Sequence, residues 1–359
     1  MKININNAKN NRASHMAKRA AKLAALTLLL TFIIITHTAC GDESPPSKTD
    51  FCLDTSCTVT IYDDMDKKEA EQLLEDTFKL MRDKENMLSR TIDDSEVAKI
   101  NGAGGQWVEA SDETIDIIRT ANMISYESGG VFDITIGKVT QMWDFKAEDP
   151  AVPEPALIQE ALPHIGYKTI TTGGGKVKLS DPEAEMDLGG VAKGAIADMV
   201  CAFLEEKGVT SAVVNLGGNV VVIGEKAEDT PWTVGIERPF TDRKELVGVI
   251  QVTDKAVVTS GIYERNFEED GKIYHHILDP ETGYPAETDL EAVTIIADKG
   301  YSGFCDAVST ACLILGKEKA PQFIEQLQTR YPDRHIEAAF IDNDGNIVQT
   351  DGMQIMPAE

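Results

Sequence analysis

Two oxygen-bearing side chains stand one helical turn apart in "GFCDAVSTACLILG", residues 303–316. The run is otherwise apolar and predicts a buried helix, in which positions four apart share a face, so Asp306 and Thr310 project to the same side. A carboxylate and a hydroxyl suit Mg²⁺ or Ca²⁺ better than a transition metal. The alternative is a capping Asp and a Thr that bonds back to a helix carbonyl. Ser309 lies about 100° around the helix from Thr310 and need not share the ligand.

A second candidate site is "MDLGGVAKG", residues 186–194, where two glycines precede a predicted helix. Glycine lets a ligand approach the backbone, and the free N–H groups at a helix start favour a phosphate or pyrophosphate. Lys193 would add a positive charge one turn into the helix. The segment matches neither common phosphate-loop pattern, so a tight turn with a solvated lysine is the alternative.

Two adjacent histidines, His275 and His276, lie in "YHHILDPETGYP", residues 274–285. Neighbouring strand residues face opposite ways, so only one of them can serve a given site. That histidine is either a general base near neutral pH or a structural residue. In "SGGVFDITIGK", residues 128–138, Phe132 and Asp133 mark either the start of a strand or a ligand-facing edge.

The sequence pattern also predicts the elements that must position these groups. We expect an amphipathic helix over 66–89, a helix that Ser111 caps and that runs toward Ser125, and a third that "DLGGVAKG" opens and Gly208 ends. A proline-rich loop at 150–155 precedes a hairpin at 168–180, and strands dominate from 211 onward. The closing hairpin contains "DNDGN", which is no calcium loop because its twelfth position is Met353. Strands with interspersed helices and no regular βαβ period predict an α+β domain with a mainly antiparallel sheet.

The N-terminus reads as an export signal. Six basic residues and an apolar run over 23–35 precede "THTAC", which resembles a bacterial lipobox ending at Cys40. We expect a signal peptide over 1–39, a lipidated Cys40 with a flexible polar tether over 40–50, and one domain over 51–359. Cleavage by an ordinary signal peptidase is the alternative, because His37 replaces the usual aliphatic residue.

Charge excludes one class of partner. The chain carries 34 basic and 60 acidic residues, and removal of the six leader cations leaves 28 basic residues and a net charge of −32. Such a surface repels phosphate backbones, so we expect no nucleic-acid binding. A bound phosphate ligand must then be recruited by a metal or by helix N-termini. Among the cysteines, spacing favours a Cys52–Cys57 pair, whereas the other three predict buried thiols, and the lack of a CxxC pair disfavours zinc.

Five motifs in order resemble the ApbE family, the FAD:protein FMN transferases. They are "SGGVFDITIGKVTQMWDF", "MDLGGVAKG", "NLGGNVVVIG", "VVTSGIYERNFEEDGKIYHHILDPETGYP" and "CDAVSTACLILG", and the resemblance covers nearly all of the chain after the tether. It implies a T-fold-like α+β domain that binds Mg²⁺ and takes FAD as its substrate. It further implies that FMN is transferred to a Thr or Ser hydroxyl of a partner protein and that AMP is released.

The resemblance also implies roles for individual residues. His276 would be the catalytic base and Asp306 a catalytic metal ligand, with Gly190 and Thr310 completing the protein's share of the metal site. The implied FAD contacts are Leu53, Thr91, Val131, Phe132, Asp133, Asp187, Lys193 and Ile277.

This chain departs from the family pattern at three places. Leu53 stands where a methionine usually contacts FAD, Arg90 and Thr91 stand where many members carry an aromatic residue, and Asn219 replaces a common aspartate. The first two leave the balance between protein flavinylation and hydrolysis of FAD open. The alternatives are therefore an FAD pyrophosphatase that gives FMN and AMP, or a non-catalytic FAD-binding lipoprotein. In each case we expect a bacterial lipoprotein whose domain lies on the extracytoplasmic side of the membrane, with an acceptor in an extracytoplasmic flavin redox system.

Overall fold

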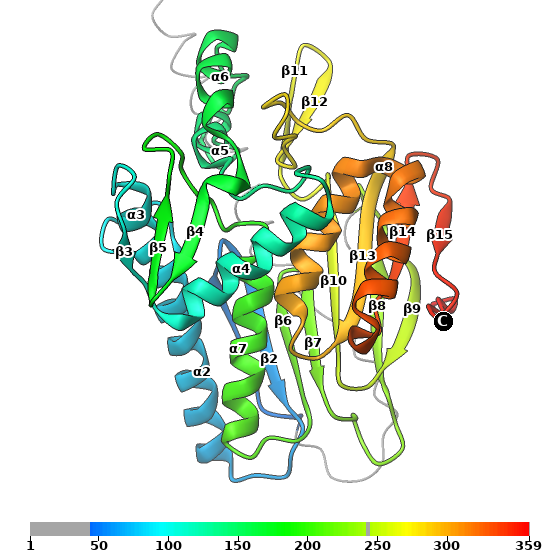
Figure 1. Cartoon of the computed structure of the whole chain (residues 1–359). Coiled ribbons are helices and arrows are strands. Elements are labelled where there is room, and N and C mark those ends of the chain that lie inside the picture. Colours follow the sequence, from blue (N-terminus) through cyan, green and yellow to red (C-terminus); the bar gives the residue numbers. More distant parts are fainter. Residues whose placement is uncertain (1–43, 242–244, 359) are drawn as a thin grey trace, which may run out of the picture. The chain divides into compact units, whose positions relative to one another are not determined.

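The computed structural model describes residues 44–241 and 245–358, and the domain Pro45–Glu359 is built on an eight-stranded sheet (Figure 1). Every pairing in this sheet is antiparallel, in the order β1-β2-β6-β7-β10-β13-β14-β15, which confirms the predicted α+β class. Its strands are β1 (Ser47–Cys52), β2 (Thr55–Ile61), β6 (Ala212–Leu216), β7 (Asn219–Ile223), β10 (Lys255–Gly261), β13 (Leu290–Asp298), β14 (Glu337–Asp342) and β15 (Ile347–Gln349).

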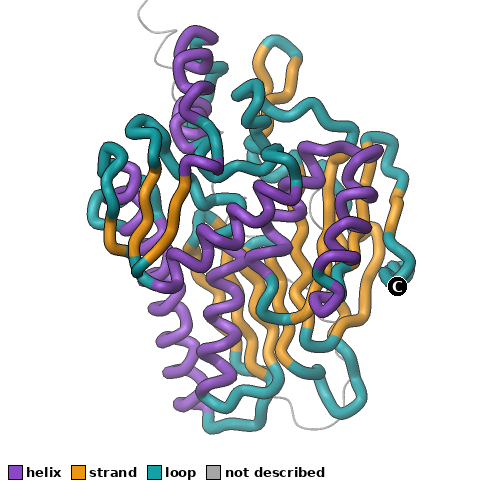
Figure 2. The backbone as a smooth tube through the Cα atoms, in the orientation of Figure 1, coloured by secondary structure: helices purple, strands orange, loops and turns teal. Residues whose placement is uncertain are grey.

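Helices cover one face of the sheet and a hairpin covers the other (Figures 1 and 2). α7 and α8 pack directly on the strands, α2 packs beside α7, and α4 crosses over α8. On the opposite face the β8–β9 hairpin buries Trp232 and Ile250 against Val222 of the sheet. The elements are α2 (Lys67–Leu88), α4 (Asp112–Glu127), α7 (Ala192–Glu206), α8 (Ser302–Arg330), β8 (Trp232–Glu237) and β9 (Leu246–Val252).

The long helices form where the apolar period predicts them. Asp66 caps α2, and Ser111 caps α4 by accepting a hydrogen bond from the Thr114 amide at 3.2 Å. α8 joins two helical segments across Gly316, whose φ of 73° breaks the helix, so the helix predicted within residues 303–316 forms its first segment.

Smaller elements surround the sheet. A three-stranded sheet, β3-β5-β4, contains the predicted hairpin. A second group at one end joins α5 and α6 to the β11–β12 hairpin through contacts of tilted aromatic rings with Trp143. Their bounds are β3 (Val108–Glu109), β4 (Ile170–Gly173), β5 (Lys176–Leu179), β11 (Asn266–Glu269), β12 (Lys272–His275), α3 (Glu96–Asn101), α5 (Gly137–Trp143), α6 (Pro155–Ala161) and the 3₁₀ turns Leu162–His164, Tyr167–Thr169 and Pro332–Arg334.

Several expectations need correction. Residues 131–136 form a loop, so the strand interpretation of "VFDITI" is wrong, and Pro155 begins α6 instead of extending the loop before it. β1 starts at Ser47, within the segment assigned to the tether, because an edge strand with polar side chains on its open face lacks an apolar pattern. The Cys52–Cys57 disulfide is absent, and both cysteines are free thiols. The hairpin register places Cys52 opposite Thr55, so the two cysteines are diagonal neighbours on the hairpin.

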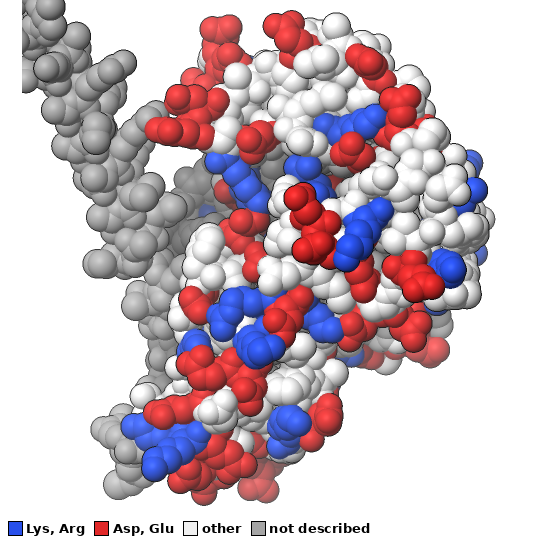
Figure 3. Space-filling model, turned by 90° about the vertical axis from the view of Figure 1, so that its left-hand side faces the viewer, with Lys and Arg blue, Asp and Glu red and all other residues white. Residues whose placement is uncertain are grey.

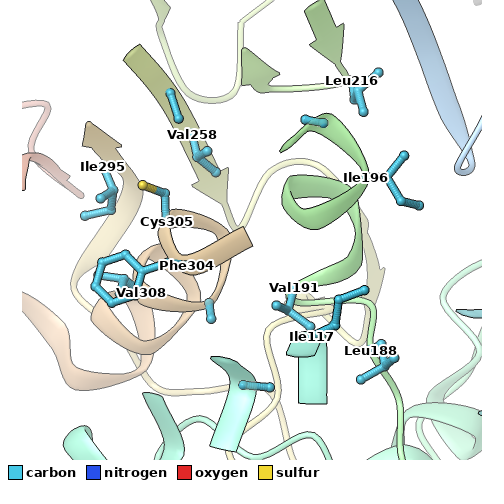
Figure 4. Close-up of a cluster of buried hydrophobic side chains, with 14 of the residues drawn as sticks. Ile117, Leu188, Val191, Ile196, Leu216, Val258, Ile295, Phe304, Cys305 and Val308 are labelled. Carbon is cyan, nitrogen blue, oxygen red and sulfur yellow. The ribbon is translucent and has the colours of Figure 1, made fainter. Parts of the chain in front are cut away.

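Glycines allow α7 and α8 to cross at very short range. A Cβ on Gly194 would lie 2.2 Å from the carbonyl oxygen of Ser302, and one on Gly303 would lie 3.0 Å from the amide nitrogen of Ala195. Figure 4 shows the side chains that surround this crossing, with Val191 and Ile196 from α7 and its approach and Phe304 and Val308 from α8. The crossing therefore fixes where the first turns of the two helices meet.

The signal peptide over 1–39 and Cys40 lie outside the described residues. Within 44–241 and 245–358, no helix is both long and apolar enough to cross a membrane. The face shown in Figure 3 carries acidic side chains interspersed with lysines and arginines, without a continuous basic tract.

Candidate functional site

Two aspartates cap the helices of the α7–α8 crossing reciprocally. Asp198 of α7 accepts hydrogen bonds from the Ser302 and Gly303 amides at the start of α8, both at 3.0 Å. Asp306 of α8 accepts one from the Gly194 amide in the first turn of α7, also at 3.0 Å. Each helix therefore supplies the acceptor for the other's unpaired N–H groups.

Asp306 is nearly inaccessible and has unused hydrogen-bonding capacity. Its exposed fraction is 3%, and among the described residues no donor bonds to its Oδ1 with normal length and angle. Burial raises the pKa of Asp306, while the positive charge of Lys193 and the Gly194 amide oppose the rise. A buried carboxylate with a free oxygen is well suited to hold a cation.

Thr310 and Gly190 adjoin this carboxylate. The Thr310 hydroxyl donates to the Asp306 carbonyl at 3.2 Å, as the alternative interpretation of this residue predicted, and its oxygen retains acceptor capacity. A Cβ on Gly190 would lie 3.8 Å from Thr310 Oγ1 and 3.0 Å from the Phe132 ring, so only glycine passes here without pushing the ring aside. The structure thus brings together the three residues predicted to hold a metal.

The donor set fits Mg²⁺ by its chemistry. It offers a carboxylate, a hydroxyl and a backbone carbonyl, all hard oxygens, and few enough of them to leave positions for phosphate and water. Within the described part of the chain no group of three or more His, Cys, Asp or Glu residues could hold a metal, which accords with a site that contains a single carboxylate. Ser309 is not part of this set, because its hydroxyl bonds to that of Ser260 on β10 at 2.7 Å.

The two histidines occupy different environments. His275 is buried, with Nε2 3.2 Å from the Ala286 carbonyl, and burial lowers its pKa to about 4. His276 lies just beyond β12, and its Nδ1 is 3.2 Å from the Arg265 carbonyl. That bond assigns the proton to Nδ1 and leaves Nε2 as the acceptor. Burial, followed by the charges of Arg265 and Lys193, lowers the pKa of His276 to about 3, so the ring is neutral at physiological pH.

Lys193 connects the carboxylate and the histidine. It lies in the first turn of α7, close enough to both Asp306 and His276 to affect their pKa values. Over residues 44–241 and 245–358 neither Lys193 nor Arg265 lies within ion-pair distance of a carboxylate. Two cations without an ion-pair partner among the described residues, in so acidic a chain, point to an anionic ligand. Sequence reasoning did not identify Arg265, whose place depends on the folded β11–β12 hairpin.

Hydrogen bonds to the side chain of Asp133 hold the loop 131–136 in place. Both oxygens of the buried Asp133 accept hydrogen bonds, from Thr135 at 2.8 and 2.6 Å and from the Tyr167 amide at 2.6 Å. Burial raises the pKa of Asp133, and these bonds oppose the rise. Its carboxylate thus holds the loop in place, while Val131 is partly accessible and the Phe132 ring lies against Gly190.

Asp187, a predicted FAD contact, forms an ion pair with Arg90, the neighbour of the predicted contact Thr91. Arg90 Nε lies 3.0 Å from Asp187 Oδ2, and Asp187 Oδ1 accepts the Gly189 amide at 2.8 Å. Thr91 is exposed beside Arg90 and its amide donates to the Ser89 hydroxyl at 3.1 Å. Arg90, noted in the sequence only as a departure, therefore orients Asp187 and the turn that leads into α7.

The two remaining predicted contacts are largely buried. Leu53 lies at the tip of the β1–β2 hairpin with φ of 54°, and its amide donates to Glu85 Oε1 at 2.9 Å. A left-handed Leu is strained, and such strain often marks a functional position. Ile277 packs in the main core, and its carbonyl accepts the Ala286 amide at 2.9 Å.

Fold and site together define an α+β protein in which the start of a helix, with Lys193 in its first turn, adjoins a carboxylate, a hydroxyl and a backbone carbonyl. The profile of the ApbE family matches residues 53–332. The chain is 33% identical over 314 residues to the FAD:protein FMN transferase of Treponema pallidum (strain Nichols), covering 82% of this chain and 86% of the relative, and 35% identical over 283 residues to that of Klebsiella pneumoniae (strain 342), covering 77% and 84%. The crystal structure of the ApbE protein from Thermotoga maritima superposes with a TM-score of 0.76 at 31% identity, covering 86% of this chain and 97% of that one. The chain belongs to the ApbE family.

Proposed function

We propose that this chain is a Mg²⁺-dependent FAD:protein FMN transferase that attaches FMN to a Thr or Ser hydroxyl of a partner protein and releases AMP. The observation that carries the proposal is the convergence of Asp306, Thr310 and Gly190 at the start of α7, with Lys193 close enough to Asp306 and His276 to affect the pKa of both. The names and extents of the relatives support the same reaction.

The start of α7 and Lys193 bind the pyrophosphate of FAD. Of the first three amides of α7, that of Ala192 donates to the Leu188 carbonyl and that of Gly194 donates to Asp306. Among the described residues this leaves the Lys193 amide and the positive end of the helix dipole for phosphate oxygens. Asp306, Thr310 and the Gly190 carbonyl hold Mg²⁺, which when bound neutralises phosphate charge that builds up as AMP leaves.

His276 takes the proton from the acceptor hydroxyl. The hydroxyl oxygen forms a new bond to the phosphorus of the FMN half, the bond from that phosphorus to the bridging oxygen breaks, and AMP departs with that oxygen. The proton passes to Nε2, because the Nδ1 position is committed to the Arg265 carbonyl. A neutral imidazole at physiological pH is the form that this step requires.

In-gel flavin fluorescence of an acceptor peptide tests this assignment. We expect His276→Ala to slow flavinylation about 10²–10⁴-fold, the usual range for loss of a general base. The matched control is His335→Ala, whose ring is exposed and pairs with Asp298. Unchanged flavinylation by His276→Ala would refute the role of the base. Release of AMP from FAD at the same rate without an acceptor would identify a pyrophosphatase, and tight FAD binding without any AMP release would identify a carrier.

We also propose that Cys40 is lipidated and that the domain acts at the extracytoplasmic face of a bacterial membrane. The lipobox-like "THTAC" after a basic and apolar leader supports this placement. Cys40→Ala should move the protein from the membrane fraction to the soluble fraction. Retention in the membrane fraction would contradict the proposal.

A further inference from the structure

Asn219 is a buried amide without a hydrogen bond of normal geometry, next to the proposed cation site. It is the first residue of β7, directly after the Gly217–Gly218 turn, and its exposed fraction is 0%. Among the described residues, neither its Nδ2 nor its Oδ1 makes a hydrogen bond of normal length and angle. Buried amides are almost always satisfied, so an unsatisfied one indicates a missing partner.

The surroundings of Asn219 show where that partner lies. β7 pairs with β6 on one side and with β10 on the other, with Asn219 opposite Leu216 and Val258, so the main chain on both sides is occupied. α8 packs on these strands, and a weak side-chain hydrogen bond from Asn219, outside normal length or angle, is one of the contributions that oppose the burial-driven rise in the pKa of Asp306. The amide therefore faces the carboxylate, which has a free oxygen of its own.

We infer that Asn219 is a positioning residue of the cation site, whose amide gains hydrogen bonds of normal geometry when a hydrated divalent cation is bound beside Asp306. The inference rests on the proposed function, because it assumes that Asp306 is a metal ligand. Asn219 holds the water shell and the free Asp306 oxygen in place. An amide in this position orients ligands without adding a second negative charge to the site.

This role makes opposite predictions for the metal-free and the metal-bound protein. Replacing Asn219 by Leu, which has a similar volume, removes two unsatisfied polar atoms from the metal-free protein and should leave its melting temperature equal or higher. The same change should weaken Mg²⁺ binding roughly 10–100-fold, as loss of a residue that orients metal ligands typically does. A merely structural asparagine would not separate these two effects.

The test is a Mg²⁺ titration of the full-length chain, in which binding is measured by the shift in melting temperature and by calorimetry. The variants are Asn219→Leu, Asn219→Asp and the control Asn122→Leu. The control removes a partly buried amide on α4, outside the site, whose buried oxygen lacks a partner among the described residues. We expect weaker binding for Asn219→Leu, equal or tighter binding for Asn219→Asp because of the added charge, and no change for the control.

The outcomes separate the inference from the proposed function. Wild-type Mg²⁺ affinity in both Asn219→Leu and Asn219→Asp, with affinity lost in Asp306→Ala, overturns the role of Asn219 and leaves the proposed function standing. Absence of Mg²⁺ binding by the wild-type chain overturns the Mg²⁺ dependence and this inference together. If Asn219→Leu does not fold, the affinity of Asn219→Asp decides, and an affinity lower than that of the wild type overturns the inference.

Discussion

Asp198 and Asp306 each cap the partner helix at one helix crossing, but they differ in how many of their carboxylate oxygens are used in hydrogen bonds to backbone amides. Asp306 is buried and Asp198 is partly buried, and each caps the other helix. Asp198 uses both oxygens on backbone amides, and burial raises its pKa to about 6. Asp306 uses one oxygen and stands beside an unsatisfied amide. A buried carboxylate with all its bonds made supports the fold, whereas one with capacity to spare marks a ligand site.

The largest expected difference between the two aspartates is in activity. Asp306→Asn keeps the shape of the side chain but removes its charge, and we expect flavinylation to fall by about 10²–10³-fold, the size seen when one preorganised electrostatic partner is lost. Initial rates with FAD and Mg²⁺ in excess measure it. The flavinylation rate of Asp198→Asn per folded molecule should stay within a few-fold of the wild-type rate. An equal loss of rate in both variants would contradict the different roles of the two aspartates.

Stability should show the reverse order. Asp198→Ala leaves two buried amides without acceptors at the start of α8, and we expect it to lower the free energy of unfolding by about 2–4 kcal/mol. Asp306→Ala exposes only one such amide and also removes a poorly solvated charge, so its loss should be smaller. Urea denaturation at pH 7 without added metal compares the two, and a larger loss for Asp306→Ala would reverse the assignment.

A third group, His275, is also buried, but its pKa is lowered instead of raised. Its pKa is lowered to about 4, so the unfolded chain, where histidine titrates near 6.5, binds more protons between these values. Stability contributed by the neutral ring is thus complete above pH 6.5 and lost as the pH falls toward 4, by up to about 3 kcal/mol. Denaturation at pH 7 and pH 4.5 should show a shallower dependence in His275→Gln, and an unchanged slope would contradict burial of the neutral ring.

The smallest effect is expected at the rim of the site. Arg90 and Asp187 are partly exposed, so their ion pair should add less than about 1 kcal/mol to stability. Arg90→Ala should instead raise the KM for FAD by roughly three- to tenfold with little change in kcat, because it frees a group that binds substrate and transition state alike. Steady-state kinetics separate the two constants, and a fall in kcat alone would place Arg90 in the chemical step.

The predictions that held were local ones. The period of apolar residues located α2, and the i, i+4 spacing placed Asp306 beside Thr310, because both depend on a single helix. The misplaced start of β1 reflects a polar edge strand, which has no pattern to read. The reciprocal caps, the Arg90–Asp187 pair and the unsatisfied Asn219 join segments far apart in the chain, so only the folded topology reveals them.

The hydrogen bond between Ser309 and Ser260 has a mechanical consequence. It fixes α8 against β10 on the side of the helix away from Thr310. If α8 slipped by one residue, each of its side chains would rotate by about 100° and translate by about 1.5 Å, which would turn Asp306 away from the start of α7. Two hydroxyls that need not contact substrate or metal thus fix the position of α8 along β10. That position determines how accurately the oxygen ligands are aligned.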